Sequence, residues 1–136
     1  MAMQLRWRRI LLGLLVAEAV PIGLLIAMVA VFGPREAGQA QAYAASLGRS
    51  VGPIAGGIMT FIMSAWAGWP VPALALRHGL ALGGLAAALD LSLIFATETP
   101  FELLFGVSNA GRVIAGALGG LVAATAGVEG RGGASR

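Results

Sequence analysis

Four long apolar stretches dominate the sequence, over residues 10–32, 51–69, 79–96 and 103–126. Short segments rich in Pro, Gly and charged residues separate them. Each stretch is about 18 to 24 residues long, the length that an α-helix needs to cross the hydrocarbon core of a bilayer. The strands of a membrane barrel would instead alternate apolar and polar residues. The pattern predicts an all-α fold, an integral membrane bundle of four transmembrane helices forming one domain over residues 1–126.

The segments between the spans carry weaker signals. Residues 35–50 are rich in Ala and Gln and follow the helix-ending pair Gly33-Pro34. Their apolar positions share one face, which predicts a short interfacial helix between spans one and two. A solvated helical linker fits the same residues. Residues 127–136 are Gly-rich and polar, and we expect them to form a flexible cytoplasmic tail.

Composition supports a membrane environment and excludes several functions. Hydrophobic residues make up 58% of the chain and charged residues 11%, against about 25% charged in a typical soluble domain. The expected partner is therefore the lipid bilayer. All nine basic residues are arginines, eight scattered at segment ends and Arg112 inside span four, so they form no basic face for nucleic acid. The chain has no Cys, which excludes disulfides, thiolate catalysis and Cys-ligated metal.

The arginines also predict the orientation. Six lie on the side of the termini and two on the side of the other loops, and cytoplasmic segments carry the excess of basic residues. The three tryptophans fall at the same interface as the termini, where amphipathic rings lie at headgroup level. We therefore expect a multi-pass protein of the cell inner membrane with both termini cytoplasmic. The six arginines are Arg6, Arg8, Arg9, Arg77, Arg131 and Arg136.

Small residues recur on one face of three spans. Helices in lipid associate through close backbone approach, which small residues permit. The faces predict tight packing within the bundle, and the alternatives are an oligomer interface or a narrow pathway between helices. The predicted packing positions are Gly52, Gly56, Ser64 and Gly68 in span two, Gly79 and Gly83 in span three, and Gly116 and Gly120 in span four.

Two intramembrane charges lie at matched depth. The midpoint of Asp90 and Arg112 is position 101, inside the turn between spans three and four, so an antiparallel hairpin brings them level. An unpaired charge at mid-bilayer costs about 2.5 to 3.5 kcal/mol on insertion scales. We predict an ion pair, with Asn109 bonding the remaining guanidinium donors. The alternatives are an ion or proton pathway in which Asp90 titrates, or an Arg112 side chain that extends to the headgroups.

Glu18 lies eight residues inside span one, about 12 Å from the inner interface. Thr60 lies at a similar depth in span two, so we expect the two to form a hydrogen bond. No cation is expected at that depth, and a carboxyl group buried without one favours its neutral acid form. Glu18 and Thr60 are therefore a candidate proton or ion site, with a neutral packing residue as the alternative. His78 is expected to be interfacial.

No constellation for catalysis emerges from the sequence. The serines have no histidine at membrane depth to act as base, and no phosphate-binding glycine loop carries the required Lys. No cofactor or metal site is expected, so we predict a non-enzymatic protein. It would act by helix association, as a membrane-complex subunit or self-assembling scaffold with a second copy or another membrane protein. The alternative is a small proton- or ion-coupled transporter or channel using Glu18, Asp90 or both.

Overall fold

The fold is all-α. The computed structural model describes residues 4–96 and 102–132, with side chains described through Gly127. It contains α1 (Trp7–Phe32), α2 (Ala37–Gly68), the short 3-10 helix η1 (Pro72–Leu74), α3 (Ala75–Ala96) and α4 (Leu103–Gly132), and no strand among the described residues. Four of these helical segments are long and apolar enough to cross a membrane. The predicted bundle of four membrane-spanning helices is confirmed, and the chain is a multi-pass membrane protein.

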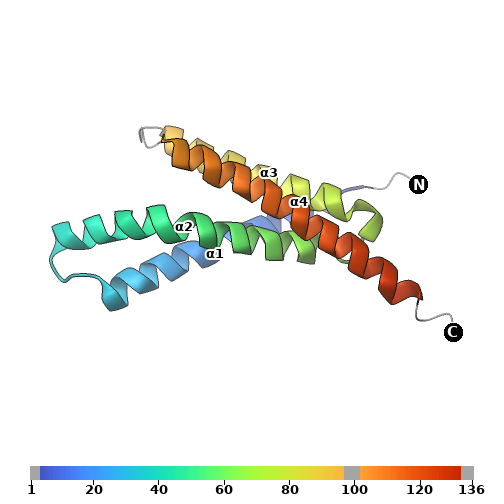
Figure 1. Ribbon diagram of the computed structural model, residues 1–136, viewed down its shortest axis with the longest axis horizontal. Coiled ribbons are helices and arrows are strands. Elements are labelled where there is room, and N and C mark those ends of the chain that lie inside the picture. Colours follow the sequence, from blue (N-terminus) through green and yellow to red (C-terminus); the bar gives the residue numbers. More distant parts are fainter. Residues whose placement is uncertain (1–3, 97–101, 133–136) are drawn as a thin grey trace.

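The four helices form two hairpins, α1–α2 and α3–α4 (Figure 1). The start of α1, the α2–α3 connection and the end of α4 lie at one end of the molecule, which we call the terminal end. The α1–α2 connection and the facing ends of α3 and α4 lie at the other, which we call the loop end. The hairpins pack against each other toward the terminal end and diverge toward the loop end, so the bundle has the outline of a V.

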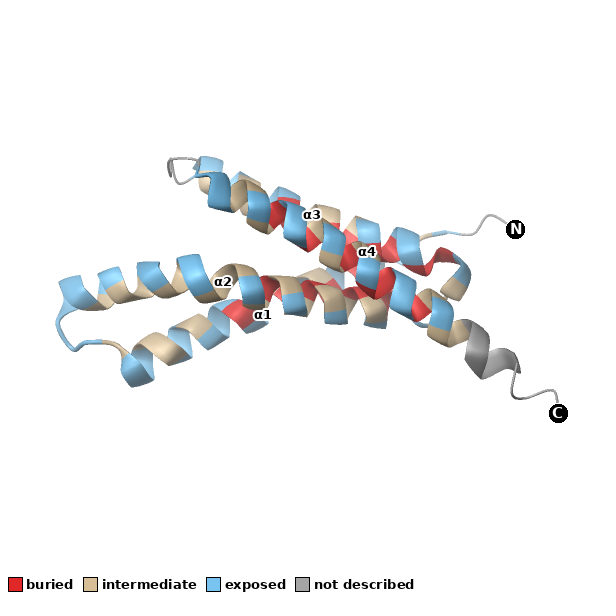
Figure 2. Cartoon of the chain, in the orientation of Figure 1, coloured by how far each residue is buried: buried red, intermediate tan, exposed pale blue. Residues whose placement is uncertain are grey.

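The buried core occupies the half of the molecule where the hairpins meet (Figure 2). Ile10, Ala67 and Leu82 form a fully buried apolar cluster contributed by α1, α2 and α3. Toward the loop end, large apolar side chains such as Phe32 and Phe95 are exposed. A bilayer is the solvent that accommodates such side chains, because lipid tails are as apolar as they are.

Glycines let α3 and α4 approach at backbone distance. A Cβ atom added at Gly83 would lie 2.7 Å from the carbonyl oxygen of Arg112 and 3.1 Å from the Cα of Val113. A Cβ atom at Gly120 would lie 2.6 Å from the carbonyl oxygen of Ala75. No side chain fits between the two helices at these positions. The contacts therefore fix both the spacing of α3 and α4 and the place of Arg112.

The larger differences from the expected helix boundaries lie in α2, α3 and α4. The short helix predicted over residues 35–50 is not separate, because α2 runs unbroken from Ala37 to Gly68. Pro53 does not end it, since membrane helices tolerate an internal proline when neighbouring groups satisfy the freed carbonyl. α3 begins earlier than predicted, at Ala75. α4 continues to Gly132, so part of the predicted flexible tail is helical, while residues 133–136 lie outside the described part.

Candidate functional site

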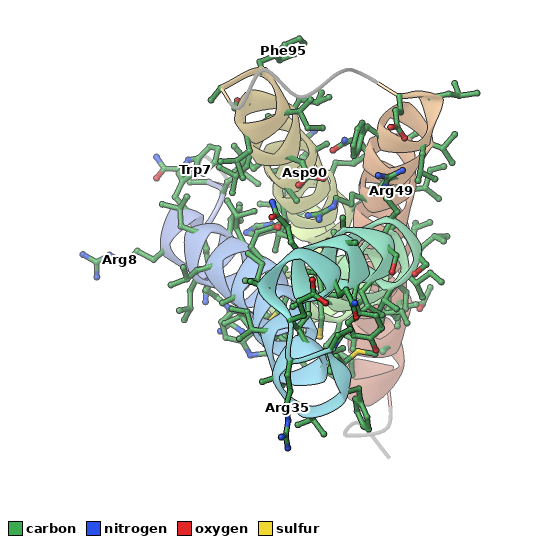
Figure 3. All side chains as sticks on the ribbon, turned by 90° about the vertical axis from the view of Figure 1, so that its left-hand side faces the viewer. Trp7, Arg8, Arg35, Arg49, Asp90 and Phe95 are labelled. Carbon is green, nitrogen blue, oxygen red and sulfur yellow. The ribbon has the colours of Figure 1, made fainter. Side chains whose placement is uncertain are left out.

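A cavity of about 340 Å³ lies between the diverging hairpins on the side of the loop end. Figure 3 looks at the molecule from that end, with Asp90 near the centre of the view and Arg35 and Phe95 at its edges. All four helices contribute to the lining. The residues are Glu18, Pro21, Ile22 and Leu25 of α1, Gly48, Gly52 and Pro53 of α2, Asp90, Leu93 and Ile94 of α3, and Phe105, Ser108 and Arg112 of α4.

Three charged side chains meet in the lining of this cavity. Arg112 Nη1 donates a hydrogen bond to Glu18 Oε1, and Arg112 Nη2 lies 3.6 Å from Asp90 Oδ2. We call Glu18, Asp90 and Arg112 the ionic triad. The side chain of Arg112 is 8% exposed, against 17% for Glu18 and 30% for Asp90. One guanidinium is thus shared by two carboxylates, and with both ionised the triad carries a net charge of about −1.

Glycines on two neighbouring helices make room for Arg112. A Cβ atom at Gly56 of α2 would lie 2.8 Å from Arg112 Nη2 and 3.2 Å from Cζ. A Cβ atom at Gly83 of α3 would lie 2.7 Å from the carbonyl oxygen of Arg112. The guanidinium therefore lies against bare backbone of α2 while its own helix is held against α3. Small residues at these two positions fix where the positive charge lies.

The structure corrects the expected partners of Glu18. The Thr60 hydroxyl donates to the carbonyl oxygen of Gly56 at 2.7 Å, so the predicted hydrogen bond with Glu18 is wrong. The expectation that Glu18 lacks a cation is also wrong, because Arg112 binds it. Depth counted along straight helices missed this contact for two reasons. Membrane helices tilt against one another, and an arginine side chain carries its charge several Å from its own Cα.

Asn109, the other predicted partner of Arg112, forms a hydrogen bond within its own helix instead. Asn109 Nδ2 donates to the carbonyl oxygen of Phe105 at 2.8 Å, and its Oδ1, the atom that could accept from the guanidinium, has no hydrogen-bond partner among the described residues. The predicted bond with Arg112 is therefore wrong. The side chain continues its own helix's bonding pattern one turn back, as polar side chains in membrane helices do. Arg112 itself is 6% exposed, so it does not extend outward to headgroup level.

The predicted packing positions lie mostly inside the bundle. Gly52 is half-buried, and a Cβ atom there would meet Leu25 at 3.9 Å. By contrast, a Cβ atom at Gly68 would lie 2.8 Å from the Cβ of Ala75. The remaining positions are buried, with the glycines of α3 and α4 facing one another's backbone. They are Gly56, Ser64, Gly79, Gly83, Gly116 and Gly120.

Two contacts close the terminal end, and the sequence did not indicate either of them. His78 is fully buried within the protein at this end, and its Nε2 accepts the backbone N–H of Arg6 at 3.0 Å. Its Nδ1 lies 2.9 Å from the carbonyl oxygen of Leu74 and therefore carries the ring proton. The guanidinium of Arg9 lies 4.1 Å from the ring centre of Trp66 and donates to that residue's carbonyl oxygen. His78 lies four residues before Leu82, a core residue, and this spacing on one helix face is the sequence signal that could have indicated its burial.

The chemistry available in the cavity is that of charge binding. Within the described ranges, no group of three or more His, Cys, Asp or Glu side chains could hold a metal ion. What the cavity offers is two carboxylates competing for one guanidinium, beside mostly apolar walls. No family model matches the sequence, and no curated protein or solved structure matches it either.

Proposed function

We propose that this chain is a small ion-coupled membrane transporter or channel, non-enzymatic, in which the cavity leads a positively charged ion to the ionic triad. One observation carries the proposal: two carboxylates share one guanidinium beside a cavity lined by all four helices. An uncompensated charge inside a bilayer is costly and marks an ion pathway by default. Binding a proton or a cation removes the excess negative charge, and releasing it restores that charge.

The flux experiment uses the purified chain in proteoliposomes with an imposed ion gradient. We expect an ion flux that is lost in Glu18→Gln and in Asp90→Asn. The matched control is Glu36→Gln, because Glu36 is an exposed carboxylate at the loop end, where it accepts a hydrogen bond from Gln39. A native chain that moves no ion above the protein-free background refutes the proposal.

The proposed orientation has the loop end outside and both termini cytoplasmic, in the cell inner membrane. Arg6, Arg8, Arg9 and Arg77 at the terminal end support it, because basic residues accumulate on the cytoplasmic side. Since the chain lacks Cys, a single introduced cysteine is the one thiol that a label can modify. We expect an impermeant maleimide to label Glu36→Cys in intact cells and Arg8→Cys only after permeabilisation. The reverse pattern would overturn the orientation.

A second candidate function is association as a complex subunit or self-assembling scaffold. The observation in its favour is that some glycines face open space, since a Cβ atom at Gly57, Gly84 or Gly111 would meet nothing within 4 Å. The tightest glycine contacts are made within the chain and offer nothing to a partner. The oligomeric state in a mild detergent tests this candidate. A stable complex that Gly57→Leu dissociates would support it, and a monomer that still moves ions would exclude it.

A further inference from the structure

Building on the proposed function, we infer that the ion is a proton and that Asp90, rather than Glu18, binds and releases it. The two carboxylates of the ionic triad are not equivalent. Glu18 accepts a hydrogen bond from Arg112 Nη1, and charge-assisted hydrogen bonds of this kind are stronger than neutral ones. Asp90 lies 3.6 Å from Nη2, beyond hydrogen-bond range, so it feels the same cation more weakly.

Exposure separates the two carboxylates in the same direction. The Asp90 side chain is 30% exposed and that of Glu18 is 17% exposed, although both line the cavity. A proton arriving through the cavity therefore reaches Asp90 more readily. The resulting arrangement is a neutral Asp90 acid beside a Glu18–Arg112 pair whose charges cancel. Protonation adds one proton to one carboxylate oxygen, and its release regenerates the carboxylate, so no other reactant is needed.

The groups that face Asp90 across the cavity are few. α1 contributes Glu18, and α4 contributes Arg112 together with the hydroxyl of Ser108. The cavity-lining residues of α2 are Gly48, Gly52 and Pro53, which neither titrate nor carry charge, and Asp90 is the only titratable lining residue from α3. Among the lining residues, the Asp90 carboxylate therefore has one cation that attracts it, Arg112, and one anion that repels it, Glu18.

The donor set suits a proton better than a metal cation. Ca²⁺ takes about six to eight oxygen ligands and Mg²⁺ requires near-octahedral geometry. The described lining supplies the two carboxylates and Ser108 as side-chain oxygen donors, and the guanidinium of Arg112 contacts both carboxylates. A positive charge in that place repels a metal ion that would bridge the two acids. A proton needs a single oxygen and removes the one excess negative charge.

Two measurements on the full chain in lipid vesicles test the inference. The first follows proton, sodium and potassium flux with selective dyes. We expect proton flux alone, lost in Asp90→Asn and retained in the control Glu36→Gln. Sodium or potassium flux without proton flux overturns the proton assignment but leaves the proposed function standing. Absence of every flux in the native chain overturns the proposed function itself.

The second measurement is the infrared difference spectrum between acidic and neutral buffer, which reads protonation without needing transport. We expect a carboxylic acid band that changes frequency in Asp90→Glu, because the C=O stretch depends on the side chain that carries the acid. A band that keeps its frequency in Asp90→Glu assigns the proton to Glu18 and overturns the inference. A native chain whose spectrum shows no buried carboxyl group taking up a proton overturns it as well, whatever the variants do.

Discussion

The spacing of α3 and α4 gives a sharp test, because Gly83 and Gly84 are adjacent on one helix and face different surroundings. A Cβ atom at Gly83 would lie 2.7 Å from the carbonyl oxygen of Arg112, 3.1 Å from the Cα of Val113 and 3.3 Å from the Cα of Gly116. A Cβ atom at Gly84 would meet nothing within 4 Å. We therefore compare Gly83→Ala with Gly84→Ala, which introduce the same methyl group one residue apart.

The expected cost follows from the geometry. Ordinary Cβ contacts begin at 3.4 Å, so the Arg112 carbonyl must recede by about 0.7 Å from the 2.7 Å position. The obstructing atoms are backbone, so the helices must separate rather than a side chain rotate. A gap of about 0.5 to 1 Å forfeits a quarter to a half of each dispersion contact along the seam. With the usual cost of overpacking, we expect Gly83→Ala to lose about 2 kcal/mol, roughly a thirtyfold change in the unfolding equilibrium.

The assay is reversible unfolding in mixed detergent micelles, followed by the loss of helical circular dichroism. Gly84→Ala should unfold no more easily than the native chain, because alanine favours a helix over glycine and finds room here. If both variants lose the same stability, the damage comes from glycine loss in general. The backbone contact between α3 and α4 would then not fix the bundle.

Three further outcomes follow from single contacts. Gly56→Ala should reduce ion flux and lower the free energy of unfolding by less than about 1 kcal/mol, because the new methyl group displaces only the flexible end of Arg112. Its neighbour variant Gly57→Ala should change neither the flux nor the stability. Arg112→Gln should cost about 3 to 5 kcal/mol in the same assay, since two carboxylates lose their cation, whereas Asp90→Asn should not destabilise the chain. Equal losses would contradict the shared ion pair. His78→Leu should lower the free energy of unfolding by about 1 to 3 kcal/mol and speed amide exchange in the N-terminal segment. Unchanged exchange would refute the hydrogen bond from the Arg6 backbone to His78 as the contact that holds this segment.

The positions of the spans could be predicted because a bilayer imposes a length on them. Apolar runs of helix length leave few alternatives, since every backbone group must be satisfied within the segment. The level placement of Asp90 and Arg112 was also accessible, because few residues separate α3 from α4 along the sequence and the two helices pack side by side. The local sequence therefore indicates both the positions of the spans and the relative depth of residues on helices that follow one another in the chain.

What the sequence could not supply is the packing between the two hairpins. Glu18 meets Arg112 across that interface, and no turn links α1 to α4 to set their relative depth. The continuity of α2 through Pro53 depends on tertiary surroundings in the same way. The burial of His78 depends on an N-terminal segment that reaches it from 72 residues away. The contacts of Glu18 and His78 are long-range, and helical periodicity does not report such contacts.

The V-shaped outline has an electrical consequence. The hydrocarbon core of a bilayer is about 30 Å thick, but water entering from the loop end would leave only the packed terminal half as insulation. The membrane voltage then falls mainly between the ionic triad and the terminal end, because low-dielectric walls concentrate the field there. A unit charge crossing that layer gains or loses up to about 2.3 kcal/mol per 100 mV. The step from the triad to the terminal end would therefore sense nearly the full voltage, and the approach through the cavity almost none.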